Sequence, residues 1–130
     1  MPVEDEQYRI TAAASTLPHA LTVDIRRADA EAAVCAVAGD LDIDSLLPAE
    51  RALTSLVDEG TPLVVVDLEG VGFCDSSGLN LLLKTRLAAS AAGVEFRLAA
   101  VATPVARVLE LTGAGAVFSI HDSVGAALVR

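Results

Sequence analysis

The second half of the chain alternates between segments of strand length and segments of helix length, and this alternation limits the folds open to it. The apolar, strand-like runs are residues 62–70, 94–101 and 116–120. The helical patterns cover about 77–92, 103–113 and the short C-terminal stretch 122–130. Strands that alternate with helices of 10–15 residues are typical of parallel crossover connections.

The first half adds two more strands and one more helix. Residues 21–27 alternate apolar and polar side chains, and residues 32–39 are almost continuously apolar. Their short connection favours an antiparallel pair. Pro48 suits the first turn of a helix that Gly60 would end. We therefore predict an α/β fold, a small mixed β-sheet of four to five strands covered by about four helices.

The helix ends and the domain limits follow from local signals. Thr103 is a candidate cap for the third helix, with Pro104 in its first turn and Gly113 after its end, and Asp122 is a candidate cap for the last helix. Residues 1–20 mix charged and small residues without a sustained period. We expect a flexible N-terminal arm over 1–20 and one folded domain over 21–130.

Charge and composition exclude some classes of partner. The chain has 130 residues with a net charge of −9, 53% hydrophobic residues, 3% aromatic residues and no Trp. An acidic chain with few aromatic rings is a poor match for nucleic acid, which requires cations for its phosphates and rings for its bases. The acidic first half suits a basic protein partner, and a merely solvated acidic surface is the alternative.

The spacing of the two cysteines bears on metal and disulfide sites, and the length of the apolar runs bears on export and membrane insertion. Cys35 and Cys74 are separated by a spacing that fits neither a metal site nor a disulfide framework, so we expect two buried thiols. No metal or cofactor is predicted. The N-terminus lacks the apolar core of a signal peptide, and the run from Leu98 to Ile120 is interrupted by charges. We expect a cytoplasmic protein without membrane insertion.

The stretch FCDSSGLNLLL, residues 73–83, places two serines where a strand gives way to a helix. Asp75, Ser76 and Ser77 are all good N-cap residues. One cap is enough to start a helix, so hydroxyl groups are left over in a loop at the end of a buried strand, where functional groups often lie. Local physics leaves a cap and a functional site equally open.

Two enzyme readings of this stretch fit poorly. A serine nucleophile on a strand-to-helix turn needs Gly-x-Ser-x-Gly, and Cys74 occupies the position of the leading glycine. The histidines available as a base are His19, in the arm, and His121. A dinucleotide-binding loop that starts at Gly70 would require a third glycine where the chain has Asp75, whose carboxylate competes with phosphate for the helix amides.

Larger segments point to a family. VVVDLEGVGFCDSSGLNLLL resembles the signature of the STAS domain, the family of bacterial anti-sigma-factor antagonists. Two further segments match in order and spacing, GDLD at 39–42 before the first helix and TPVARVLELTGAGAVFSI at 103–120. The resemblance covers residues 21–130 and leaves only the arm outside.

The resemblance implies a phosphorylation switch. In the family, an anti-sigma factor that is also an ATP-dependent serine kinase phosphorylates the first serine, which is Ser76 here, with Ser77 as the alternative. The unphosphorylated protein binds the anti-sigma factor and frees the sigma factor, and a serine phosphatase resets the switch. The resemblance predicts no catalytic residue. The residues expected at the partner-binding surface are Asp42, Asp75, Ser77, Gly78 and Leu81.

The leucines after the serines predict which side of the helix is buried. Leu79, Leu82, Leu83 and Leu87 cluster on one face at 100° per residue, whereas Leu81 lies nearly opposite, near Lys84. We therefore expect Leu81 to be exposed, either as an ordinary surface leucine or as part of the partner-binding surface. Arg86 falls on the core side, and its head group should reach out to solvent.

Three other functions remain as alternatives. A STAS domain also serves as a scaffold of a signalling assembly or as an accessory subunit of a transport complex. The third alternative is an enzyme that uses Ser76 as its nucleophile.

Overall fold

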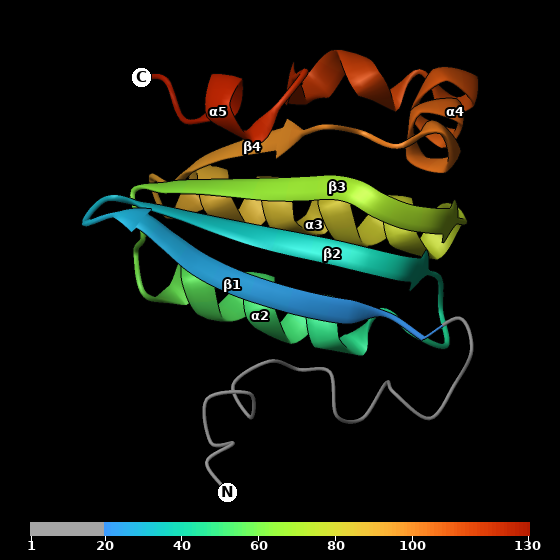
Figure 1. Cartoon of the computed structure of the whole chain (residues 1–130), viewed down its shortest axis with the longest axis horizontal. Helices are drawn as coiled ribbons and strands as arrows, with labels where there is room; N and C mark the ends of the chain where they lie inside the picture. Colours follow the sequence, from blue (N-terminus) through green and yellow to red (C-terminus); the bar gives the residue numbers. More distant parts are fainter. Residues whose placement is uncertain (1–19) are drawn as a thin grey trace, which may run out of the picture.

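The structure is a computed structural model that describes residues 20–130, so the arm predicted over 1–20 lies, except for its last residue, outside the described residues (Figure 1). Five strands form one sheet in the order β1-β2-β3-β4-β5. The strands are β1 Thr22–Asp29, β2 Ala32–Leu41, β3 Leu63–Cys74, β4 Glu95–Ala99 and β5 Ser119–His121. The helices are α2 Leu47–Asp58, α3 Ser76–Ala91, α4 Thr103–Thr112 and α5 Val124–Ala127, with a 3-10 turn η1 at Ala114–Val117.

The sheet is mixed, which confirms the prediction. β1 and β2 form an antiparallel hairpin whose turn is held by the Asp29 carboxylate, which accepts a hydrogen bond from the Glu31 amide at 2.8 Å. The pairs β2–β3, β3–β4 and β4–β5 are parallel. Each parallel pair is joined through a helical connection, as the alternation of the sequence indicates.

Helices α2 and α3 cover one face of the sheet, behind the strands in Figure 1, and α5 covers part of the other face. β3 runs through the middle, and its side chains alternate between the two faces. Val64 and Val66 belong to the larger core with α2 and α3, whereas Leu63 and Val65 belong to the smaller core under α5. A continuous β-branched run is thus explained by burial on both faces.

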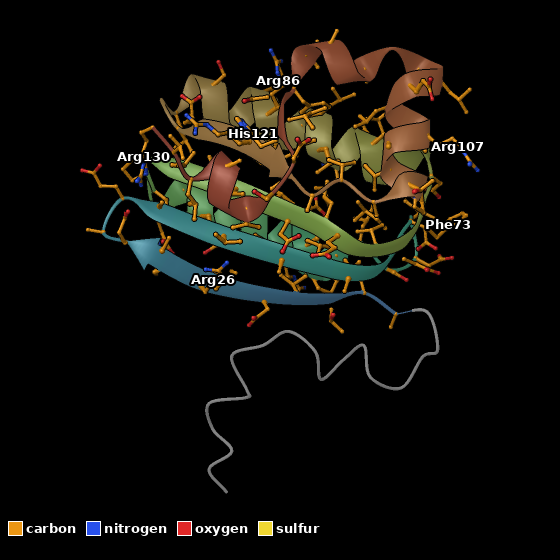
Figure 2. All side chains as sticks on the ribbon, turned by 45° about the horizontal axis from the view of Figure 1, so that its top comes forward. Arg26, Phe73, Arg86, Arg107, His121 and Arg130 are labelled. Atoms are coloured by element: carbon orange, nitrogen blue, oxygen red, sulfur yellow. The ribbon has the colours of Figure 1, made fainter. Side chains whose placement is uncertain are left out.

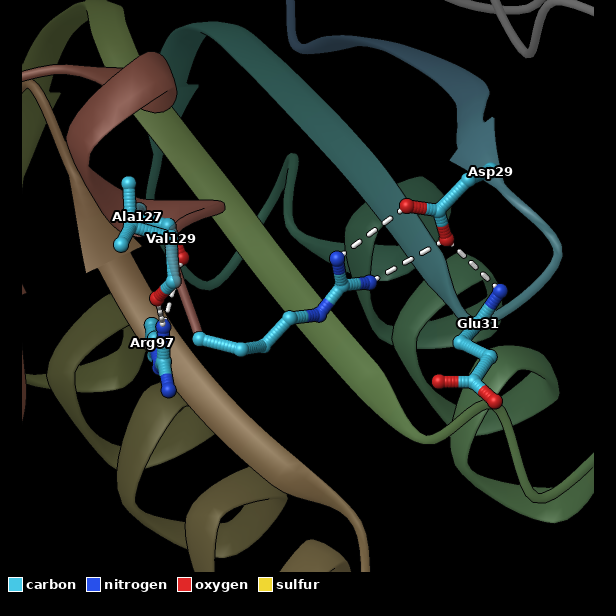
Figure 3. Close-up of polar contacts among 6 residues, drawn as sticks. Asp29, Glu31, Arg97, Ala127 and Val129 are labelled. Atoms are coloured by element: carbon cyan, nitrogen blue, oxygen red, sulfur yellow. Dashed lines mark hydrogen bonds and ion pairs between the residues drawn. The ribbon is translucent and has the colours of Figure 1, made fainter.

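The short helix α5 is held on the sheet by two arginines (Figure 3). Arg97 of β4 donates hydrogen bonds from Nη1 to the carbonyl oxygens of Ala127 at 2.9 Å and Val129 at 2.6 Å. Arg130 forms a two-bond ion pair with Asp29 of the β1–β2 turn, at 3.1 Å for each bond. The C-terminal segment therefore contacts both an inner strand and the hairpin at the far edge.

Three local predictions are wrong in detail. Ala102 is the N-cap of α4, because Thr103 is already helical, and Ser123 rather than Asp122 caps α5 by accepting a hydrogen bond from the Ala126 amide. The strand predicted over 116–120 starts only at Ser119. Gly113 adopts a left-handed φ of 75° that lets the chain turn into η1 before the strand begins.

Within residues 20–130, no helix combines the length and the apolar character that a membrane span requires.

Candidate functional site

Two loops meet at one edge of the sheet because β2 and β3 are parallel and end in register. Leu41 of β2 pairs with Cys74 of β3, so Asp42 and Asp75 follow directly on neighbouring strands. The Asp75 amide also donates a hydrogen bond to the Leu41 carbonyl oxygen at 3.4 Å. The structure thereby brings together two acidic residues that the resemblance had placed at the site.

Asp75 is the residue that caps α3. Its carboxylate Oδ1 accepts hydrogen bonds from the amides of Ser77 at 2.8 Å and Gly78 at 3.1 Å. Its extended backbone, with φ −113° and ψ −169°, is the usual conformation of an N-cap. The cap therefore uses neither serine hydroxyl, and both stay available for other chemistry.

The two serines differ in their surroundings. Ser76 is exposed, whereas Ser77 is half-buried. Within the part of the chain that the structure describes, neither hydroxyl has a hydrogen-bond partner. A hydroxyl that is exposed and unpaired, on a backbone fixed by a neighbouring cap, is accessible to a modifying enzyme without any opening of the fold.

Asp42 organises the second loop. Its carboxylate Oδ1 accepts hydrogen bonds from the amides of Asp44 at 3.2 Å and Ser45 at 3.0 Å, and its carbonyl oxygen accepts from Ser45 and Leu46. This turn closes the loop just before α2. Asp42 is half-buried, and its oxygen atoms hold the backbone of this turn. Its carboxylate also supplies negative charge beside the serine loop, which comprises Asp75, Ser76 and Ser77.

Gly78 is the point where α3 touches the end of β2. A Cβ atom at this position would lie 2.3 Å from the Leu41 carbonyl oxygen, 2.9 Å from Leu41 Cγ and 3.0 Å from Cys74 Sγ. No other residue fits without moving backbone atoms. Gly78 is buried, so its role at the site is structural: it lets the start of α3 pack closely against the end of β2.

The expectation for Leu81 is wrong. Its side chain is only 4% exposed and belongs to the main core, whereas Leu87, expected on the buried face, is 62% exposed. The reason is that α3 packs against α2 as well as against the sheet, so its buried surface is wider than one stripe and is turned towards α2. Leu81 thus supports the site from inside and exposes very little of its own surface.

Arg86 behaves partly as predicted. It lies half-buried on α3, and its Nε donates a hydrogen bond to the Val117 carbonyl oxygen at 2.7 Å. The head group leaves the core, as expected, but it ends on η1.

Two exposed apolar side chains beside the serine loop are not among the residues that the sequence predicts for the site. Ile43, in the Asp42 loop, is 67% exposed, and Phe73, just before the cap, is 49% exposed. Figure 2 shows Phe73 at the same end of the molecule as Arg107 of α4. The signal was present in the sequence: an isoleucine within the acidic GDLDID loop, and one of only three phenylalanines at the end of a strand.

The thiol next to the cap is unreactive. Burial raises the pKa of Cys74 to about 11, and the nearby Asp75 carboxylate adds to the rise. The thiol therefore stays protonated near neutral pH, and only thiolate is a strong nucleophile or metal ligand. Among residues 20–130, no group of three or more His, Cys, Asp or Glu side chains is arranged to hold a metal ion.

Comparisons with known proteins show which sequences and folds this chain resembles. The family model of the STAS domain matches residues 23–127. An anti-sigma-B factor antagonist of Staphylococcus aureus is 34% identical over 77 residues, which cover 59% of this chain and 71% of that protein.

Solved structures give the same picture. An anti-sigma factor antagonist from Mycobacterium paratuberculosis is similar with a TM-score of 0.78 at 26% identity, over 86% of this chain and 94% of that one. The Bacillus cell fate determinant SpoIIAA in its phosphorylated form shares the fold, with a TM-score of 0.65 at 19% identity, over 82% of this chain and 96% of that one. With a family model that covers most of the described residues, the chain belongs to the STAS domain family.

Proposed function

We propose that this chain is an anti-sigma-factor antagonist controlled by phosphorylation of Ser76. In its unphosphorylated form it binds an anti-sigma factor that has serine kinase activity, and this binding releases a sigma factor for transcription. Phosphorylation of Ser76 by the same partner ends the interaction, and a serine phosphatase restores it. The names of the relatives support the class of partner.

One observation carries the proposal: Ser76 is exposed, and its hydroxyl has no hydrogen-bond partner among residues 20–130, because the Asp75 carboxylate caps the helix instead. A kinase reaches this hydroxyl without unfolding the site. In the transfer, a bond forms between Ser76 Oγ and the γ-phosphorus of ATP, the bond from that phosphorus to the β-bridging oxygen breaks, and ADP leaves. The hydroxyl proton passes to a base of the kinase.

The same geometry explains how a phosphate would act. A phosphate on Ser76 adds nearly two negative charges at the first turn of α3, where the helix dipole tolerates them, so the fold survives. Asp75 and Asp42 already place negative charge at this edge. A partner surface that fits a neutral hydroxyl, flanked by the exposed Ile43 and Phe73, would then have to accommodate a strongly hydrated dianion.

The test uses the purified chain with its anti-sigma factor and ATP. We expect one phosphate in the intact mass and its assignment to Ser76 by fragment spectra. Ser76→Ala should bind the partner and resist modification, whereas Ser76→Asp should lower the affinity by roughly tenfold to several hundredfold.

Ser77→Ala is the matched control, since it removes the neighbouring hydroxyl and leaves Ser76 in place. It should still be phosphorylated. Modification at other residues alone, or equal affinities of the wild type, Ser76→Ala and Ser76→Asp, would refute the switch at Ser76.

A further inference from the structure

A hollow of about 210 Å³ opens between α2 and α3 next to the serine pair, and only one of the two serines lines it. Its polar members include Ser77, Asn80, Glu50 and Lys84, and its floor includes the buried Leu81. Ser76 is not part of its wall. The two adjacent hydroxyls therefore face different environments.

The helix geometry explains the difference. Ser77 and Lys84 are seven residues apart, so they lie within about 20° of each other on the face of α3, separated by about 10 Å along the axis. Ser76 is eight residues from Lys84 and lies about 80° away around the helix. Side chains on a helix lean towards its N-terminus, so the flexible lysine stem extends in the direction of Ser77.

Lys84 already has an acidic partner. Its Nζ lies 3.1 Å from Glu50 Oε2 of α2, and the two side chains are 59% and 33% exposed. An ion pair that is this open to solvent is weak, worth about 0.2–1 kcal/mol. A new negative group on the same face of the helix can therefore compete for the ammonium.

We propose that Lys84 makes the two serines unequal: a negative group on Ser77 draws the Lys84 ammonium away from Glu50, whereas one on Ser76 leaves the Glu50–Lys84 pair intact. The inference rests on the proposed function only in that a serine of this pair carries a phosphate. Lys84 acts here as a positioning residue, because its effect on α2 is transmitted through its ion pair with Glu50.

The consequence is a second kind of signal from one short loop. When Lys84 leaves, the Glu50 carboxylate is unpaired in the hollow that Ile43 also lines, and α2 loses its ionic contact with α3. Charge on Ser76 changes the surface only at the cap. Charge on Ser77 also changes the α2 side of the site.

Double-mutant cycles test this inference in the absence of any partner. The free energy of unfolding in urea is measured for Ser77→Asp, Lys84→Met and the double variant, and for the same set with Ser76→Asp. Ser77→Asn and Ser76→Asn are the matched controls, because they keep the shape and remove the charge. We expect a coupling of about 1.4- to 5-fold in the unfolding constant between positions 77 and 84, and none between 76 and 84.

A second cycle follows the existing ion pair. The coupling between Glu50→Gln and Lys84→Met should be measurable in the wild type and in Ser76→Asp, and should disappear in Ser77→Asp. Equal coupling of both serines to Lys84, or a Glu50–Lys84 coupling that persists in Ser77→Asp, overturns the inference. Failure of the kinase to modify Ser76 would contradict the proposed function and leave these cycles unchanged, so the two failures are distinguishable.

Discussion

At the scale of single residues, Gly78 holds the two halves of the site together. It is one of the first residues of α3, and it lies directly against the Leu41 carbonyl oxygen at the end of β2. A side chain there would force the serine loop away from the Asp42 loop. The contact therefore sets the distance between the two loops that the proposed partner would recognise.

Gly78→Ala should destabilise the protein. The added Cβ would lie 2.3 Å from a backbone oxygen, and such overpacking typically costs about 1–3 kcal/mol, partly offset by the better helix propensity of alanine. Gly72→Ala is the control, because a Cβ at Gly72 meets no atom within 4 Å. We expect the control to stay within about 1 kcal/mol of the wild type in urea unfolding. Similar stabilities of the two variants would contradict this prediction, because they would mean that the end of β2 moves away from the added Cβ at little cost.

The sequence locates the start of α3, but it does not show which residue caps the helix. Asp75, Ser76 and Ser77 were equal candidates for the cap, because all three side chains carry a suitable oxygen. The choice of Asp75 depends on backbone angles, which composition does not reveal. The sequence predicts the wrong side for Leu81, because helical periodicity shows where leucines cluster and does not show that a second helix, α2, covers the adjacent face.

At the scale of elements, α5 depends on one side chain more than on its own length. A helix of four residues has almost no intrinsic stability. Arg97 binds two carbonyl oxygens at its C-terminal end, and Ala127 packs into the smaller core. The Asp29–Arg130 pair, at the surface, adds a weaker contact.

Arg97→Met should loosen the C-terminal segment without unfolding the sheet. The variant keeps an apolar stem but loses both hydrogen bonds, and bonds to charged groups contribute about 1.5–3 kcal/mol. We expect amide hydrogen exchange in residues 124–130 to rise by roughly tenfold or more, with β1–β3 unchanged. Arg107→Met is the control, since the exposed Arg107 side chain makes no hydrogen bond or ion pair with the residues that the structure describes. Unchanged exchange in Arg97→Met would contradict this role.

The order and type of most elements could be predicted, because strand and helix periods differ clearly over 62–112. The 3-10 turn η1 and the bounds of the last strand could not. Residues 114–121 are short and apolar, and a 3-10 turn, a strand and a loop have similar patterns at that length. Their structure depends on the left-handed Gly113 and on pairing with β4, which is a long-range contact.

At the scale of the whole molecule, the buried sheet controls the chemistry of its thiols. Cys35 lies in β2, between β1 and β3, and is fully buried. Burial raises the pKa of Cys35 from its ordinary value of 9.0 to about 12, and the Asp24 carboxylate adds to the rise. The folded state therefore keeps this proton at pH values where an unfolded chain would release it.

The free energy of unfolding should consequently fall at alkaline pH. The contribution of Cys35 is complete below about pH 9 and is lost as the pH rises towards about 12, because the unfolded thiol ionises first. At about pH 10.5 we expect a loss of about 1–2 kcal/mol, measured by urea unfolding against about pH 8. Cys35→Ala should show a flatter pH dependence, which separates this thiol from lysine and tyrosine. Identical pH dependence in both proteins would exclude the effect.

The pairing of β2 with β3 has one more consequence. The Asp42 loop and the serine loop are distant in the chain and become neighbours only when Leu41 aligns with Cys74. A partner that reads both loops recognises a composite surface, and a linear segment that contains the serines offers only half of it. Chains that are misfolded or still being synthesised would then not bind this partner. The strand register that builds the domain would thus also restrict binding to fully folded copies.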